Sequence, residues 1–316
     1  MESLSYSLNA TVPVFLVIVL GYLLRQAGLL NEEFVRVSNA FNFKVTLPTL
    51  LFHDMANSAI RESFDPLLVG FCAGCTTVMF FGLWCLARRF LKDKSMVGAF
   101  VQAGYRSSVA ILAVAFLTNI YGDAGLAPQM ILGAVPLFNI YAVLVLTLEG
   151  PGREGDLGQS LKKAARGIVT NPILIGVVLG MVFSLLGLVL PPILDKTVST
   201  VGSLATPQAL ICIGAGFEGK KAIAKLRPTI AASCIKLLVL PAVFVPLAIV
   251  LGLREQALLT VLILLGTPTT PSCYVMARNM GGDEILTSSV VVCTTVLSAF
   301  TLTFWLFFFR QLGYLG

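Results

Sequence analysis

The residues best suited to chemistry lie in two short stretches that interrupt apolar sequence. The stretch from Gly104 to Ser108 carries Arg106 near the middle of one apolar segment, and the stretch from Gly266 to Met276 carries Pro268 and Pro271 within another. An arginine at the centre of a membrane helix costs roughly 2.5 to 3.5 kcal/mol on insertion scales, so a partner must offset it. Because a guanidinium fits a carboxylate bidentately, Arg106 favours a bound organic anion.

Hydroxyl side chains gather at the same two stretches, and each can donate or accept a hydrogen bond. They would orient a small polar ligand beside Arg106, although each one could instead bond to a helix carbonyl. Asn139 lies within another apolar segment, where an amide either lines a cavity or bonds to a neighbouring helix. The hydroxyl residues are Ser107, Ser108, Thr269, Thr270 and Ser272.

Arg106 also has a structural interpretation, as a cation bonded to backbone carbonyls that a helix break leaves free, or as one that reaches a water-filled cavity. We favour the functional interpretation, because ionisable groups inside membrane segments mark substrate and ion pathways. The apolar segments offer no obvious acidic partner deep within them. A bound anion is therefore the expected partner.

Neither stretch is expected to continue as an ordinary helix. Pro268 and Pro271 each remove a backbone donor, and in hydrocarbon the freed carbonyls must find other partners, so the chain should be unwound and face protein or water. Interrupted spans form the binding sites of many carriers, where half-helix N-termini point at an anion. The residues expected at breaks and bends are Gly104, Gly266, Pro268, Pro271, Pro48 and Pro207.

The elements that must position these residues are predicted to be membrane helices. The chain is 57% apolar with 12% charged residues, against roughly 45 to 50% and 25% in soluble domains, and its mean hydropathy is +0.90. A spanning helix needs about 20 mostly apolar residues. The chain divides into ten such segments, at residues 8–27, 34–56, 66–88, 96–120, 126–148, 168–189, 193–217, 229–252, 256–279 and 285–309.

The net charge of +6 does not indicate a nucleic-acid partner, because the basic residues follow the positive-inside rule. Of 22 Lys and Arg residues, fifteen fall in loops on one side, four in the opposite loops and tail, and three within the segments. Both termini are therefore expected on the non-cytoplasmic side of the cell membrane. Besides Arg106, the segments contain Lys44 and Lys236, which can snorkel toward the inside face and receive no role.

The seven cysteines and the single histidine suggest neither a metal nor a cofactor. Cys72 and Cys75 form a CxxC without further metal-ligand partners, so they are expected to pack. His53 and Asp54, near the outer end of the second segment, could couple protons, but an interfacial hydrogen-bonded pair explains them more simply. No nucleophile with a base, phosphate loop or metal cluster supports catalysis.

An internal repeat relates the two halves of the chain. Pro13 and Pro172 are 159 residues apart, and so are Gly21 and Gly180. Each half holds five segments, an odd number, so the second half must enter the membrane from the opposite side, as in inverted-repeat transporters. The predicted division is a first repeat at 1–148, a cytoplasmic linker at 149–166 and a second, inverted repeat at 167–316.

The proline-rich stretch from Pro268 to Asp283 resembles the signature of the auxin efflux carrier family, in the form of its bacterial malonate-transporter-like members. The Arg106-Ser107-Ser108 stretch is similar to the Arg-Ser-Asn motif of that branch, with Ser108 replacing the usual asparagine. The stretch from Leu47 to His53 resembles the second-helix motif of the plant PIN-formed carriers. The similarity covers nearly the whole chain, and Ser108 leaves open a different substrate choice.

This resemblance implies an all-α fold of ten helices, with broken helices 4 and 9 that cross. Helices 1, 2, 6 and 7 would form a scaffold that dimerises, while helices 3–5 and 8–10 would form a mobile domain that carries organic acid anions, such as malonate, malate or auxin-like acids, by an elevator movement. The implied site comprises Arg106, Ser107, Ser108, Asn139, Tyr141, Thr269, Thr270, Pro271 and Ser272, with Leu47 and Leu51 as the scaffold wall.

Two further functions remain open from the sequence. A sodium-coupled symporter that resembles bile-acid carriers would keep the fold and make Arg106 structural, but the spans contain few deep acidic residues to coordinate sodium. A membrane-embedded sensor would use the same fold only to bind a ligand. The carrier of small carboxylates is the preferred hypothesis, and neither an enzyme nor a nucleic-acid-binding protein is expected.

Overall fold

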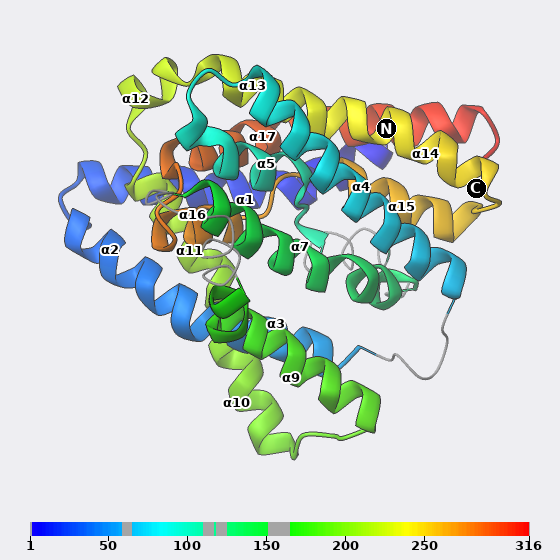
Figure 1. The fold of residues 1–316 in the computed structure, drawn as a ribbon, viewed down its shortest axis with the longest axis horizontal. Coiled ribbons are helices and arrows are strands. Elements are labelled where there is room, and N and C mark those ends of the chain that lie inside the picture. The colour runs from blue at the N-terminus through cyan, green and yellow to red at the C-terminus, as the bar shows by residue number, and fades with distance from the viewer. Residues whose placement is uncertain (1, 59–64, 110–116, 118–124, 151–164, 316) are drawn as a thin grey trace.

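The computed structural model describes the whole chain except residues 1, 59–64, 110–116, 118–124, 151–164 and 316 (Figure 1). Its described residues contain helices and no strands. Much of the fourth predicted segment and of the 149–166 linker therefore lies outside the described residues.

Most of the described helices lie within the predicted segments, whereas the fourth segment, residues 96–120, contains only the short helix α5 and a few further described residues. In the first half the helices are α1 (Glu2–Gln26), α2 (Glu32–Phe41), η1 (Asn42–Thr46), α3 (Leu47–Ala56), α4 (Pro66–Phe90), η2 (Lys94–Met96), α5 (Val97–Tyr105) and α7 (Ala127–Glu149). In the second half they are α9 (Pro172–Leu186), α10 (Pro192–Ser203), α11 (Ala205–Ala215), α12 (Gly219–Ala224), α13 (Leu226–Cys234), η3 (Ile235–Val239), α14 (Leu240–Val250), α15 (Glu255–Gly266), α16 (Ser272–Asn279) and α17 (Glu284–Gln311).

Several helices begin at residues whose side chains cap them. Asp65 precedes Pro66 at the start of α4, and its carboxylate accepts hydrogen bonds from two backbone N–H groups of the first turn. Asn171 does the same before Pro172 of α9, and Asp283 caps α17. An N-cap oxygen accepts hydrogen bonds from backbone N–H groups that have no intrahelical partner. A proline at N1 lacks only an N–H group that would have had no intrahelical partner.

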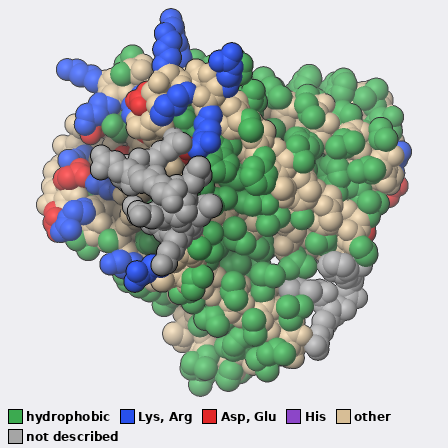
Figure 2. Space-filling view, viewed as in Figure 1, with side chains coloured by type: hydrophobic (Ala, Val, Ile, Leu, Met, Phe, Trp, Pro, Cys, Tyr) green, Lys and Arg blue, Asp and Glu red, His purple; other side chains and the backbone are tan. Residues whose placement is uncertain are grey.

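Length and apolarity identify the molecule as a polytopic membrane protein. Among the described residues, five helical stretches are long and apolar enough to cross a bilayer. Figure 2 shows hydrophobic side chains over much of the surface. Four large apolar residues of α9 are exposed, namely Ile175, Val178, Leu179 and Val182. Such exposure is expected of residues that face lipid and not of residues in the core of a soluble domain. The five stretches are Pro66–Phe90, Ala127–Glu149, Pro192–Ala215, Leu226–Val250 and Glu284–Gln311.

Glycines allow two helix pairs to pack with their backbones in close contact. A Cβ atom on Gly21 of α1 would lie 2.3 Å from the carbonyl oxygen of Ile211 in α11, and one on Gly180 of α9 would lie 2.5 Å from that of Phe52 in α3. Small residues at such positions are typical of membrane helix pairs. Each of these glycines is separated from its counterpart by 159 residues, and so are their contacts, Phe52 and Ile211.

The bend expected at Pro48 takes the form of a widened turn. The π-helical turn η1 (Asn42–Thr46) precedes Leu47-Pro48, so the helix continues through the proline whose missing N–H would otherwise interrupt it. Pro207 lies in the first turn of α11, and the Asn42 side chain donates to the carbonyl of Ala205 at 2.8 Å. The two bends therefore contact each other.

Two expectations for polar side chains are corrected by the structure. Lys44 in η1 is exposed, as a snorkelling lysine can be, but Lys236 in η3 is fully buried and donates to the backbone carbonyl of Leu265. His53 pairs with Asp195 of α10 at 3.1 Å rather than with Asp54. Neighbouring residues of a helix point in different directions, so His53 and Asp54 cannot easily pair.

Candidate functional site

Both interruptions that the prolines and glycines indicate are present in the structure. The helix α5 ends at Tyr105, and Arg106 to Ser108 are non-helical. In the ninth segment α15 ends at Gly266, and α16 begins at Ser272 after a non-helical connection. The backbone N–H of Ser108 donates to the carbonyl of Pro268 at 2.9 Å. The two breaks therefore meet directly in space.

Two hydroxyl groups join the breaks reciprocally. Ser107, after α5, donates through Oγ to the carbonyl of Leu264 near the end of α15. Thr269, after α15, donates through Oγ1 to the carbonyl of Ala103 near the end of α5, at 2.7 Å. The last carbonyls of a helix lack intrahelical partners, and an unpaired carbonyl in hydrocarbon is costly. These two hydroxyls thus stabilise the crossing.

Arg106 is buried at this crossing among neutral partners. Its side chain is only 2% exposed. Nη2 donates to Asn139 Oδ1 at 3.0 Å and to Ser272 Oγ at 2.9 Å, while Nη1 contacts the thioether sulfur of Met276 at 2.9 Å. Nε has no hydrogen-bond partner, and within the described part of the chain no carboxylate pairs with Arg106. The positive charge is therefore not neutralised by the described residues.

The partners of Arg106 are themselves held in place. Asn139 of α7 donates through Nδ2 to the carbonyl of Val135 at 2.9 Å, which directs its Oδ1 toward the guanidinium. Ser272 and Met276 are one turn apart on α16, so they present side chains on one face of that helix. A thioether is a weak acceptor, so one arm of the guanidinium contacts only a weak hydrogen-bonding group.

A cavity of about 60 Å³ adjoins Arg106. Its polar side comes from the two breaks and from Asn139, and its apolar side comes mainly from α3 and α7. A volume of this size accommodates only small species, so a larger acid requires the apolar wall to move away. The lining residues are Leu47, Leu50, Leu51, Arg106, Ser107, Ser108, Val109, Val135, Phe138, Asn139, Thr206, Ala209, Thr270, Pro271 and Ser272.

The structure brings nine of the eleven predicted substrate-binding residues to this cavity. The other two, Thr269 and Tyr141, do not line it. Thr269 is occupied by the crossing hydrogen bond, whereas the ring of Tyr141 stacks on Phe80 with centroids 4.5 Å apart. The Tyr141 hydroxyl lies 3.0 Å from Thr77 Oγ1 on α4. Tyr141 thus belongs to the packing of α4 against α7.

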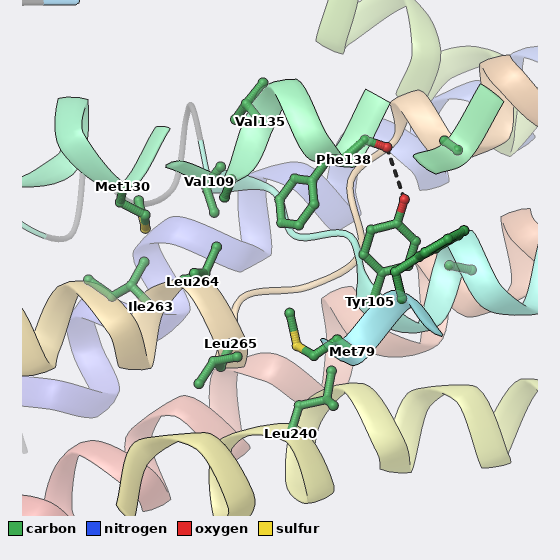
Figure 3. Close-up of a cluster of buried hydrophobic side chains, with 14 of the residues drawn as sticks. Met79, Tyr105, Val109, Met130, Val135, Phe138, Leu240, Ile263, Leu264 and Leu265 are labelled. Carbon is green, nitrogen blue, oxygen red and sulfur yellow. Dashed lines mark hydrogen bonds between the residues drawn. The ribbon is translucent and has the colours of Figure 1, made fainter. Parts of the chain in front are cut away.

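The nine predicted residues at the cavity are Leu47, Leu51, Arg106, Ser107, Ser108, Asn139, Thr270, Pro271 and Ser272, while the hinge residues Gly104, Gly266, Pro268, Pro48 and Pro207 do not line it. Tyr105 does not line the cavity but bonds to α7, the helix that carries Asn139. Its hydroxyl donates to the carbonyl of Phe138 at 2.9 Å, next to Asn139 (Figure 3).

Sequence reasoning missed three side chains at the crossing. Met276 contacts Arg106, Gln102 donates through Nε2 to the carbonyl of Cys273 at 3.0 Å, and Lys236 bonds to the end of α15. Lys236 and Gln102 carried a signal, because each is polar within an apolar segment. Met276 carried none, since methionine is common in apolar cores.

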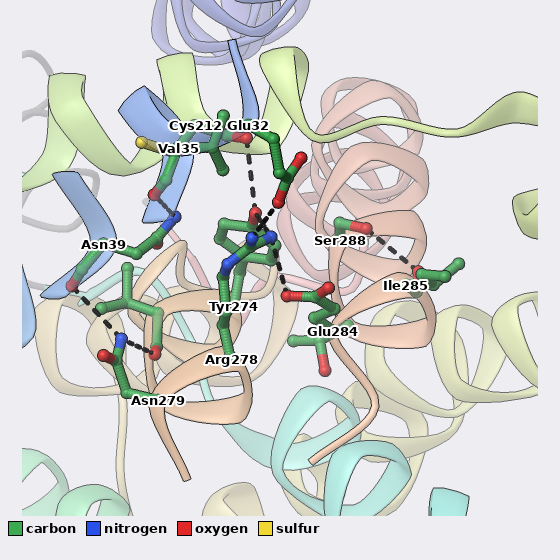
Figure 4. Close-up of polar contacts among 12 residues, drawn as sticks. Glu32, Val35, Asn39, Cys212, Tyr274, Arg278, Asn279, Glu284, Ile285 and Ser288 are labelled. Atoms are coloured by element: carbon green, nitrogen blue, oxygen red, sulfur yellow. Dashed lines mark hydrogen bonds and ion pairs between the residues drawn. The ribbon is translucent and has the colours of Figure 1, made fainter. Parts of the chain in front are cut away.

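A second polar cluster lies at the other end of α16, around Arg278 (Figure 4). Arg278 pairs with Glu32 of α2 and, at 2.9 Å, with Glu284 of α17. It also donates to the Tyr274 hydroxyl at 3.3 Å, and that hydroxyl contacts the carbonyl of Cys212 on α11. Here the arginine is neutralised by carboxylates and connects three helices.

These features define a class of membrane protein in which an interrupted pair of helices places a buried arginine, neutralised by no described carboxylate, beside a cavity. The chain belongs to the membrane transport protein family, whose model matches residues 6–306 and which includes the auxin efflux carriers. The resemblance that the proline-rich motif indicated is therefore confirmed at the level of the family. The protein is a transporter and not an enzyme.

Curated relatives are similar over nearly their whole length. An uncharacterized transporter of Methanothermobacter thermautotrophicus is 24% identical over 307 residues, which is 95% of this chain and 97% of the relative. An uncharacterized transporter of Methanocaldococcus jannaschii is 21% identical over 305 residues, covering 92% of this chain and 95% of the relative. Both relatives are described as transporters without a stated substrate.

Proposed function

We propose that the protein is a secondary carrier of small organic acid anions, with carboxylates of the malonate and malate type or auxin-like acids as candidate substrates. The observation that carries this proposal is the state of Arg106, which is buried at the crossing with Nε unpaired and without a carboxylate partner among the described residues. A buried charge requires a counter-charge or dense hydrogen bonding. A substrate carboxylate would supply it.

The surrounding groups give the anion an orientation. Ser272 is the first residue of α16, so the positive end of this helix dipole faces the same cavity as Arg106. Ser108 and Thr270 add polar groups, and Leu47 and Leu51 of α3 would contact the apolar part of the acid. Arg106 would neutralise one carboxylate while Ser272 and Asn139 hold the guanidinium.

Alternating access by an elevator movement fits the packing. The pair α1 with α11 and the pair α3 with α9 would form the scaffold. Each pair joins one helix from each half, and the two pairs correspond to each other under the 159-residue offset between Gly21 and Gly180, as the proposed inverted repeats require. The crossing and its neighbours α4, α5, α7 and α13 to α17 would move against this scaffold. The cavity wall from α3 would then be the surface that the substrate site slides along, and the scaffold would also form the homodimer contact.

The charge distribution supports an orientation in the cell membrane. Lys220, Lys221 and Arg227 are exposed around α12 and α13, and Figure 2 shows basic side chains gathered at this end, whereas Figure 1 places both chain termini at the opposite end. By the positive-inside rule this end would face the cytoplasm and both termini the other side.

Flux measurements on purified protein in liposomes test the proposal. Wild type should take up labelled malonate, malate or an auxin-like acid, Arg106→Ala should abolish uptake while remaining folded in detergent, and Arg106→Lys should restore only part of it, since lysine cannot form the planar bidentate pair. Equal uptake by wild type and Arg106→Ala would remove the arginine from the mechanism.

A thermal-shift screen of mono- and dicarboxylates identifies the substrate and the coupling ion. Stabilisation by a carboxylate without sodium is the expected result. Stabilisation that requires sodium would indicate the sodium-coupled symporter instead, and binding without flux in the liposomes would indicate a sensor.

A further inference from the structure

Lys236 is a second buried cation near the crossing. Its side chain is fully buried in η3, within the membrane-spanning stretch Leu226–Val250. Among the described residues no carboxylate pairs with it, and its Nζ donates a hydrogen bond to a backbone carbonyl. An ammonium group in such a position is costly, so its retention needs an explanation.

The partner of Lys236 is a carbonyl that the break in the ninth segment leaves free. At the end of α15 the Ile263 carbonyl accepts the Thr267 N–H at 3.1 Å, and the Leu264 carbonyl accepts the Ser107 hydroxyl. The Leu265 carbonyl accepts Lys236 Nζ. Lys236 and Ser107, the neighbour of Arg106, therefore bond to consecutive carbonyls of the same helix end.

The local structure builds this position into the eighth segment. The π-helical turn η3 precedes Leu240-Pro241, and Trp305 of α17 donates through Nε1 to the Leu237 carbonyl at 2.9 Å. The end of α15 packs against this region, and Leu265 and Leu240 belong to the same buried apolar cluster (Figure 3). The amine is thus aimed at α15 by a turn that is itself bonded to α17.

A hydrogen bond alone does not require a charge at this place. Ser107 satisfies the adjacent carbonyl of Leu264 with a neutral hydroxyl, and a neutral side chain could do the same for Leu265. What the ammonium adds is an electrostatic effect. A helix C-terminus carries a partial negative charge of about half an electron, and α15 ends at the crossing, where that charge would repel a bound anion.

We propose that Lys236 is a positioning residue of the anion site, whose buried ammonium neutralises and fixes the C-terminal end of α15 so that the crossing accepts a carboxylate. Arg106 contacts the substrate in this mechanism, and Lys236 acts through α15 and Ser107. The inference rests on the proposed carrier function, because it assigns Lys236 a role in anion affinity.

Two substitutions separate the charge from the hydrogen bond. Lys236→Gln keeps a donor for the Leu265 carbonyl and removes the charge, whereas Lys236→Met removes both with little change in volume. Both variants should raise the Kd and KM for malonate roughly tenfold, as expected for loss of a charge at a helix end in a buried site, with kcat changed less than KM. Lys44→Met is the matched control, because Lys44 occupies the other π-helical turn before a Leu-Pro pair but is exposed.

The measurements are malonate-dependent thermal shift in detergent, malonate flux in liposomes and the melting temperature without ligand. The expected result is weaker malonate binding by both Lys236 variants, wild-type binding by Lys44→Met, and a melting temperature of Lys236→Gln close to wild type. Wild-type affinity in Lys236→Gln, or unfolding of both Lys236 variants, would reduce Lys236 to a structural donor and overturn the proposal. If wild type itself binds neither malonate nor any other tested carboxylate, the carrier function fails first and the role of Lys236 fails with it.

Discussion

Two arginines are associated with the short helix α16: Arg278 belongs to it, Arg106 contacts it from the neighbouring break, and their partners differ in kind. Arg278, near its C-terminal end, pairs with Glu32 and Glu284. Arg106 contacts Ser272 and Met276 at its N-terminal side and is surrounded by neutral groups. The positive charge of an arginine with carboxylate partners is already neutralised, whereas an arginine without them can bind an anion from solution. The comparison supports the proposed binding site, because Arg106 has no carboxylate partner among the described residues.

The positions of the two clusters add a second contrast. Arg278 connects α16 to α17 and to α2, and only its pair with Glu32 of α2 joins the proposed moving part to an element of the scaffold segment, which the elevator movement would separate from it. Arg106 and its partners Asn139 and Ser272 all lie within the proposed moving part. Substrate affinity should therefore depend on Arg106 and its partners, and the balance between transporter states should depend on Arg278.

The largest effect should come from giving Arg106 the kind of partner that Arg278 already has. Asn139→Asp places a carboxylate at the atom that accepts from Arg106 Nη2, with almost unchanged shape. The new ion pair should compete with the substrate and raise the Kd for malonate about 30-fold, which corresponds to roughly 2 kcal/mol.

Thermal-shift titration measures this change, and the ligand-free variant should melt no lower than wild type. Unaltered malonate affinity in Asn139→Asp would show that the charge of Arg106 is not what holds the anion.

A smaller effect is expected from Ser272→Ala. The hydroxyl accepts from Arg106 Nη2 at 2.9 Å and lies at the start of α16, so its loss should let the guanidinium move. We expect the KM for carboxylate uptake to rise roughly fivefold, equivalent to about 1 kcal/mol. Thr269→Ala is a useful contrast, since Thr269 lies outside the cavity and bonds to Ala103; it should lower the melting temperature more than it raises the KM.

The smallest effect on affinity should come from Arg278→Gln. This change breaks the pairs with Glu32 and Glu284, whose side chains are 63% and 37% exposed, so solvent screening limits the loss of stability to about 1 kcal/mol. Malonate Kd should stay within twofold of wild type, while the turnover rate in liposomes should change. A large rise in Kd with unchanged turnover would contradict the division between the two arginines.

A charge reversal refines the same point. Exchanging the partners, with Glu32→Arg combined with Arg278→Glu, should restore part of the wild-type turnover if the contact between α2 and α16 matters for the transport cycle. Each single reversal should slow turnover more than the pair does, because it places like charges opposite each other at positions 32 and 278, whereas the repulsion between Arg278→Glu and Glu284 is common to that single variant and the pair.

Much of the site could be predicted because its signals are local. Arg106 interrupts an apolar segment, and Pro268 and Pro271 remove donors wherever they occur in a helix. The sequence predicted less well which way each side chain points. Tyr141 lies two residues after Asn139, yet a helix turns about 200° over two residues, so Asn139 faces Arg106 while Tyr141 stacks on Phe80.

Lys236 is buried, and this is a second property that the sequence did not predict. Its distance from the end of its segment suggested a snorkelling lysine, but the π-helical turn η3 and the end of α15 enclose it completely. Such burial depends on the neighbouring α15, whose carbonyl it meets 29 residues further along the chain.

The amino-acid order by itself determined that the chain is a polytopic membrane protein, that two of its spans are interrupted, and that an arginine without an obvious acidic partner lies in one of them. These properties follow from hydrophobicity, missing backbone donors and charge, which act within a few residues. Only the tertiary structure decided that the two interruptions meet, that Ser107 and Thr269 bond across them, and that Lys236 reaches the end of α15. Those contacts join segments distant in sequence, so they depend on how the helices pack.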